Sequence, residues 1–208
     1  TLTATDNVTI ASASTIQTDM SPTGWSSLAS LLPLNVSVAV TYSTSDILID
    51  GASNITASGN LSVNAEAITQ STILSQSNSA GAALVAAVSA TENRATVNVG
   101  DNASLSGSDG VTLKTKGKTQ VTAIADASAG SIANLSGAIA IGVGIVRDNT
   151  STIIGDEASI TSASGDIQVL ADSQSQTVFA ARAANDDNFT ATVQEKFDAG
   201  IDDTAALN

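Results

Sequence analysis

The chain has 208 residues, and its 20 acidic and 7 basic side chains give a formal net charge of -13 at pH 7. It contains no cysteine and no histidine, which excludes disulfides, thiolate zinc sites and histidine-based catalysis. The negative charge disfavours nucleic acid and anionic membranes as partners, and aromatic residues, at 2% of the chain, are too few to fill a globular core with rings.

The chain repeats itself with a unit of 50 to 56 residues. Four segments with a common pattern begin near residues 6, 59, 109 and 165. Their first large apolar residues, separated by 53, 50 and 56 positions, are Val8, Leu61, Val111 and Ile167. Because a fixed period is the signature of a repeat architecture, we expect these four residues to form one inward-facing ladder.

Each unit predicts three longer strands and a short one. The opening strand alternates apolar and polar residues from the ladder residue onward, which is typical of a half-buried strand. The middle strand carries a bulky column, which we expect to fill the core, at 34–40, 84–88 and 139–145. A third strand (47–49, 97–99 and 152–154) ends in Gly/Asp turns, and a short strand then leads into the next unit.

The residues between the bulky ones of the middle strand are small. They include Ala39, Ala87, Ser89, Ala140, Gly142 and Gly144. Glycine is unfavourable in a strand interior, so its presence indicates that another backbone comes close. We therefore expect this small-residue face to be a packing surface, either within the chain or between chains of a filament.

The pattern predicts an all-β fold, namely a parallel β-solenoid (β-helix) of about four repeats. The repeats lie near 6–58, 59–108, 109–164 and, in part, 165–182. They make up a domain at 1–182 with a variant loop at 18–33. Apolar residues recur every four positions from Phe189 to Ile201, so a short helical segment is expected at 183–208, as a cap or the start of the next element. The period leaves open whether one unit forms one coil or two.

Two columns of polar residues would stack along such an array. Nine positions after each ladder residue stands a glutamine, namely Gln17, Gln70, Gln120 and Gln176. Lys116 shares its column with Glu66 and Asp172, so stacking would set a cation between two anions. We interpret both columns as structural side-chain ladders.

No catalytic, cofactor or metal site is predicted. Acidic residues at the corners could supply oxygen ligands to calcium: Asp101, Asp109, Asp156, Glu157 and Asp166. None of them lies in a calcium-binding nonapeptide or an EF-hand loop, so solvated turns are the preferred interpretation and calcium the alternative. A polysaccharide-cleaving enzyme would need carboxylates clustered in a cleft, whereas these are spread over turns.

The N-terminal residues and the most apolar stretch of the chain are considered as a leader and as a membrane span. The chain begins with Thr and lacks a charged-then-apolar leader, so we expect a piece of a longer protein. The uncharged stretch 127–146 is rich in Gly and Ser, and its columns hold polar residues in other repeats. A strand is therefore expected there, and no transmembrane segment.

Four strings of residues resemble the repeats of very large bacterial surface adhesins. They are Ser-Ala-Gly-Ala-Ala-Leu-Val-Ala-Ala-Val (79–88), Ala-Thr-Val-Asn-Val-Gly (95–100), Ala-Ser-Leu (103–105) and Gly-Val-Thr-Leu (110–113). The resemblance is to filamentous-haemagglutinin-like and leukotoxin-like proteins and covers roughly residues 6 to 180. It implies a secreted or cell-surface protein that forms a stalk or filament and is often adhesive.

The first functional hypothesis is a structural repeat segment of an exported bacterial filament or adhesin, acting as a stalk with a role in adhesion or assembly. Its partners would be neighbouring repeats, copies of itself, or a host or cell-surface glycan or protein. Every repeated column has a packing role and none is left for chemistry, so we expect no enzymatic activity and no cofactor. The alternatives are a glycan- or surface-binding solenoid module and a solenoid polysaccharide lyase or hydrolase.

Overall fold

The computed structural model describes residues 1–21, 34–79, 83–129 and 138–183, which form three parallel β-sheets. Sheet A contains the short strands β1 (Leu2–Ala4), β4 (Asn54–Ala57), β7 (Ser104–Gly107) and β10 (Ser159–Ser162). Sheet B contains β2 (Val8–Met20), β5 (Asn60–Ser79), β8 (Gly110–Ala129) and β11 (Ile167–Ala183). Sheet C contains β3 (Leu34–Ile49), β6 (Ala83–Val99) and β9 (Ala138–Ile154). The predicted all-β fold with parallel sheets is thereby confirmed.

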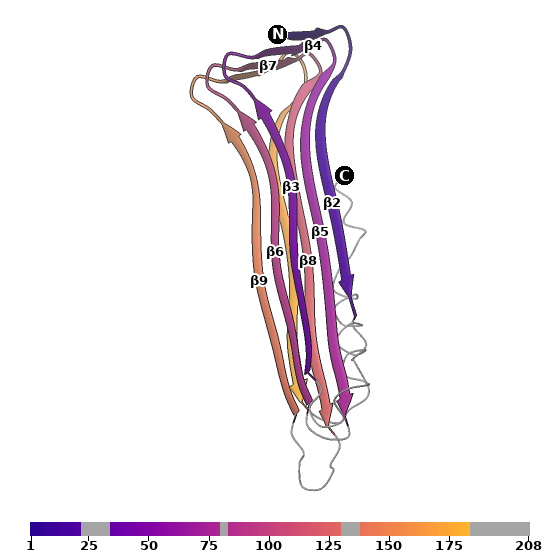
Figure 1. Cartoon of the computed structure of the whole chain (residues 1–208). Helices are drawn as coiled ribbons and strands as arrows, with labels where there is room; N and C mark the ends of the chain where they lie inside the picture. The colour runs from indigo at the N-terminus through magenta and orange to yellow at the C-terminus, as the bar shows by residue number, and fades with distance from the viewer. Residues whose placement is uncertain (22–33, 80–82, 130–137, 184–208) are drawn as a thin grey trace.

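The chain visits the three sheets in a fixed order. A long strand of sheet B is followed by a long strand of sheet C and then by a short strand of sheet A, after which the chain returns to sheet B beside its previous strand (Figure 1). Each repeat thus contributes one strand to each sheet. The register pairs Val8 with Leu61, Leu61 with Val111, and Val111 with Ile167, which confirms the predicted adjacency. This arrangement is compatible with the predicted solenoid.

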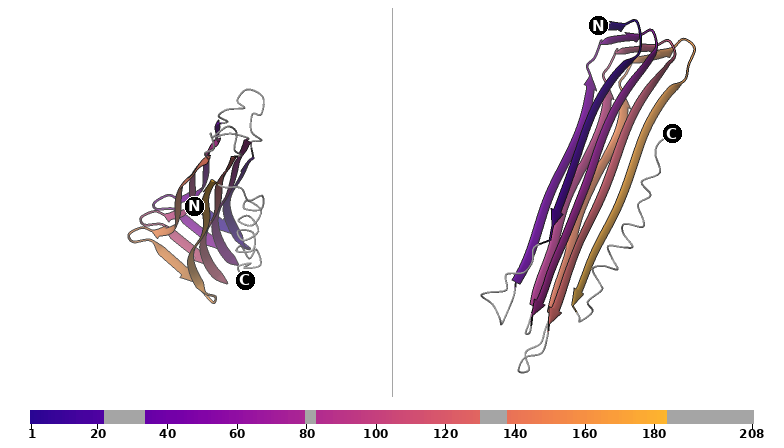
Figure 2. Two further views of the ribbon diagram at one scale, coloured as in Figure 1. Left: turned by 90° about the horizontal axis from the view of Figure 1, so that it is seen from below. Right: turned by 90° about the vertical axis from the view of Figure 1, so that its right-hand side faces the viewer.

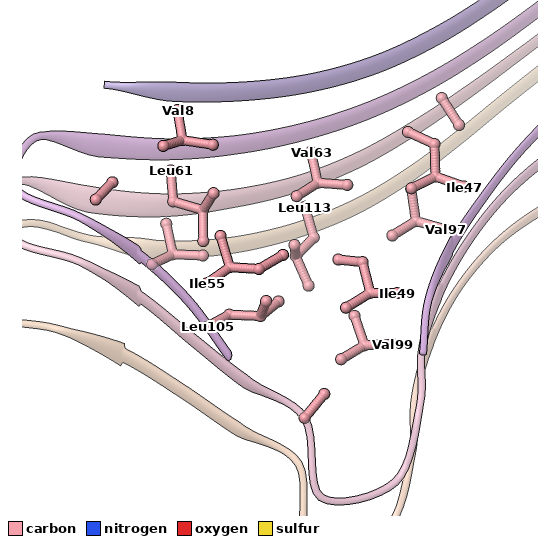
Figure 3. Packing of buried hydrophobic residues seen from close by; sticks show 14 residues of the cluster. Val8, Ile47, Ile49, Ile55, Leu61, Val63, Val97, Val99, Leu105 and Leu113 are labelled. Atoms are coloured by element: carbon pink, nitrogen blue, oxygen red, sulfur yellow. The ribbon is translucent and has the colours of Figure 1, made fainter. Parts of the chain in front are cut away.

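The large aliphatic core lies where the three sheets meet. Figure 2 shows the long strands as two elongated layers with the short strands of sheet A across one end. At that end Leu61 and Leu113 of sheet B, Ile49 and Val99 of sheet C, and Leu105 of sheet A point toward one another (Figure 3). All five are buried. The third sheet holds the two long sheets apart here, and Leu, Ile and Val fill the space.

Away from sheet A, sheets B and C pack directly on each other through small and hydroxyl side chains. The apolar cluster at this end consists mainly of alanines, with Ile73 and Val85 as its larger members. Between the two apolar clusters the interior is polar, and the hydroxyl groups of Ser71 and Ser89 lie 3.3 Å apart. The interior is therefore thin, and most of its polar groups find partners across the two sheets.

The bulky column of the middle strand lies on the opposite side from the one predicted. Val38 is 53% exposed, Ile141 47% and Ile145 57%, whereas their small neighbours point toward sheet B. The prediction that this column fills the core is wrong. The interior between sheets B and C is filled mainly by small residues, with Ile73 and Val85 as its larger members, so it has no room for a full column of bulky side chains. The strict alternation of each strand therefore turns this column outward.

Other differences concern where elements begin and end. The predicted middle and third strands form one continuous strand in each repeat, and neither Gly nor Pro separates them. β2 continues to Met20, past the predicted start of the variant loop, and β11 continues to Ala183. The predicted helical segment covers 183–208; Ala183 is the last residue of β11, and 184–208 lie outside the described residues.

Candidate functional site

The acidic residues considered as calcium ligands lie in two different sets of turns. Asp101, Asp156 and Glu157 belong to the turns from sheet C to sheet A, and Asp109 and Asp166 to the turns from sheet A to sheet B. Within the described ranges, no three His, Cys, Asp or Glu side chains gather in a way that could hold a metal ion. The structure thus separates these carboxylates into small groups along the stack.

One of these carboxylates, and that of Asp50 at the equivalent turn, accept hydrogen bonds from backbone amides. The carboxylate of Asp101 accepts a hydrogen bond from the Asp156 amide of the next repeat at 2.9 Å, and that of Asp50 accepts one from Gly51 at 2.9 Å. One position of the turn adopts a positive φ in every copy, at 58°, 59° and 58° for Ala52, Asn102 and Glu157. A side chain engaged in holding a turn has a structural role that requires no ligand.

The polar columns predicted as ladders lie on the outer face of sheet B. The register places Gln17, Gln70, Gln120 and Gln176 in one row across the four strands. Glu66, Lys116 and Asp172 form a second row, in which the ammonium group of Lys116 lies 3.1 Å from a carboxylate oxygen of Glu66. Both side chains of this ion pair are partly exposed, so it contributes little to the free energy of unfolding.

The residues predicted as a packing face line the inner side of sheet C. Ala39, Ala87 and Ser89 are buried, whereas Ala140, Gly142 and Gly144 of β9 are half-buried. A Cβ added to Gly142 would lie 2.8 Å from the backbone oxygen of Ala180. A Cβ on Gly144 would collide with the ring of Phe179. Ala140 contacts the alanine-rich cluster from the edge.

Two surface features were not singled out as sites from the sequence. The first is the outer face of sheet C, where the bulky residues stand in solvent. The second is a hollow on the outer face of sheet B, whose lining includes Ser62, Asn64, Glu66, Lys114 and Lys116. The small size of the facing residues on sheet B, such as Ser71 and Ser75, could have revealed the first feature, since it shows that the interior is thin.

Comparisons with known proteins place the chain in no family. No family model, curated protein or solved structure matches it. In the part of the chain that the structure describes, no helix has the length and apolarity needed to cross a membrane.

Proposed function

We propose that the chain is a segment of a parallel β-solenoid and serves as a structural repeat segment of an exported bacterial filament or adhesin. In this proposal it acts as a stalk at the cell surface or outside the cell and takes part in adhesion or assembly. Copies of itself and neighbouring repeats are its first partners. Catalysis, a cofactor and a metal ion have no part in this role.

The proposal rests mainly on the regular stacking of one repeat on the next. The four sheet B strands keep one register through 17 to 20 consecutive paired positions where they are longest, and the turns keep it as well. The amide of Gly100 donates to the Ile49 carbonyl at 2.8 Å, and Gly155 repeats this bond to Val99 at 2.7 Å. A repeat that pairs both its strands and its turns with its neighbour builds length in one direction, which is what a stalk needs.

The chemistry of the described residues supports a structural role. Asp and Asn side chains at the turns bond backbone amides, and the inner positions pack between the sheets. Calorimetric titration with calcium is expected to show no binding at submillimolar concentrations. Binding in that range would replace this part of the proposal with a calcium-stabilised stalk.

Export can be tested with an antibody raised against the folded chain. If the chain is part of a surface filament, the antibody labels intact cells that make the full-length protein, and immunogold particles lie away from the envelope. Labelling only after lysis would refute export. An intracellular protein, probed with its own antibody before and after lysis, serves as the control that the cells are intact.

The glycan-binding alternative has one observation in its favour. Lys114, Lys116 and Lys118 point outward in a row along β8, and the hollow beside them presents hydroxyl, amide and charged groups. Such groups are suited to hydrogen bonding with an acidic glycan. A glycan array would favour this alternative if it showed binding that Lys114→Gln abolishes.

A further inference from the structure

The outer face of sheet C carries an uninterrupted apolar area at the end remote from sheet A. Every outward position from 34 to 40, from 84 to 90 and from 139 to 145 is Leu, Val, Ile or Ala. The exposed fractions reach 64% at Leu34, 53% at Val38 and 58% at Ile139. We name these outward residues the sheet C patch.

The same chain covers its other long sheet in a different way. From Thr112 to Gln120, every outward residue of β8 is Thr, Lys or Gln. Threonine has a strand propensity close to that of valine, so strand formation alone does not require an aliphatic face. At the end remote from sheet A, the outward aliphatic residues of sheet B include Leu74, which is half-buried, and Ile124, which is buried, whereas those of β3 and β9 stand in solvent. The exposed aliphatic residues therefore indicate that the sheet C patch is covered in the working protein.

Charged and aromatic residues border the patch on the side toward sheet A. The register sets Tyr42, Glu92 and Arg147 in one row, and the guanidinium group of Arg94 lies 3.2 Å from a carboxylate oxygen of Asp46 nearby. The border thus holds two arginines and two acidic residues, so their charges cancel, whereas the whole chain has a net charge of -13. An apolar centre with a border of Tyr, Arg and mixed charges is the usual anatomy of a protein interface.

The size of the face fits a pairing of two chains. The 16 residues of β3 span about 50 Å and three strands about 14 Å, so the outer face of sheet C covers roughly 700 Å². A standard interface buries about 800 Å² on each partner. The sheet C patch takes up about half of the face and would form the dehydrated centre of the interface.

We infer that two copies of this chain pair through the outer faces of sheet C, with the sheet C patches in contact. A face that is apolar at its centre and locally neutral can meet an identical face without repulsion between the faces themselves. An anionic lipid surface is a poorer occupant, because the rest of the chain would be repelled from it. The inference deepens the proposed structural role by naming the partner and the face.

Sedimentation of the 208-residue chain over a wide range of concentrations tests the inference. We expect a species of twice the mass of one chain, and we expect salt to strengthen it by screening the repulsion between two acidic chains. Val143→Glu should weaken pairing at least about tenfold, because it would bury an unpaired charge. Val143→Thr keeps the strand propensity and should weaken pairing less, so it shows that the loss is not a loss of folding. Leu170→Glu, at an exposed residue of β11, is the matched control and should leave pairing unchanged.

Cysteine crosslinking locates the contact, because the chain has no cysteine of its own. A short bismaleimide should link Val143→Cys chains into dimers and should not link Thr112→Cys chains, whose label lies on the outer face of sheet B. Three outcomes would overturn the inference: a monomer at the highest attainable concentration, a dimer that Val143→Glu leaves intact, or a monomer that floats with phosphatidylcholine vesicles. None of these outcomes bears on the proposal that the chain is exported. That proposal is refuted separately if the antibody labels only lysed cells.

Discussion

Replacing Gly142 by valine tests how closely sheets B and C pack. Gly142 lies on the inner side of β9, and a Cβ there would come within 2.8 Å of the Ala180 oxygen and 3.2 Å of its carbonyl carbon. Both contacts are with backbone, which cannot rotate away as a side chain can. The two sheets would have to move apart locally to admit the new side chain.

The magnitude follows from two opposing terms. Valine in place of glycine gains up to about 1 kcal/mol of strand propensity at an unhindered site. Overpacking of a tight interior costs about 1–3 kcal/mol, and more where backbone must shift. We therefore expect Gly142→Val to lower the free energy of unfolding by about 1–3 kcal/mol, which corresponds to a fall in Tm of roughly 2–12 °C for a chain of this size.

Thermal and urea unfolding followed by circular dichroism measures the change. Ala86→Val is the matched control, because Ala86 pairs with Ile141 in the register and points to the outer face. It adds similar bulk one position away and should leave stability unchanged or slightly higher. If Gly142→Val proved as stable as the wild type, the interior would not be tightly packed and the account of the small-residue face would fail.

Three further changes test other parts of the structure. Asn93 is fully buried, and its amide group donates to the Ala67 and Lys118 carbonyls at 3.1 and 3.3 Å. In urea unfolding, Asn93→Ala should lower the free energy of unfolding by about 1–3 kcal/mol, and Asn93→Asp should lower it more because it buries a charge. Wild-type stability in both variants would contradict this. Asn102→Val should cost about 1–3 kcal/mol because a β-branched residue resists φ 59°, while Asn102→Gly should change little, and equal thermal melts of the two variants would refute the turn geometry. Lys116→Gln should lower the free energy of unfolding by at most about 1 kcal/mol at low salt and should not change it at high salt. A larger or salt-independent loss would mean that Lys116 and Glu66 do more than pair two surface charges.

The repeat period determined the register of the strands without any knowledge of the structure. Val8, Leu61 and Val111 occupy equivalent positions in successive units, and the structure pairs them directly. The inference worked because stacked units must repeat their side chains at the same place in each strand. The Gly/Asp turns were found for the same reason.

The inner and outer faces of sheet C could not be assigned in the same way. Alternation shows that Val38 and Ala39 point to opposite sides, but it does not say which side is inside. The prediction placed the bulky column of the middle strand inward, as bulky residues are near sheet A, where Ile47 and Ile49 are buried. It fails farther along the strand because the interior becomes too thin there. Interior thickness depends on how sheet B sits against sheet C, which no single strand encodes.

The stacking of one repeat on the next is the central claim, and a distance between the first and last repeats measures it. Spin labels on Gln17→Cys and Gln176→Cys would report across all four strands of sheet B, because the two residues lie in one row. Three strand spacings separate the backbones by about 14 Å, so double electron–electron resonance should give a narrow distribution below about 25 Å once the labels are included. A broad distribution, or one centred beyond about 30 Å, would contradict the stack.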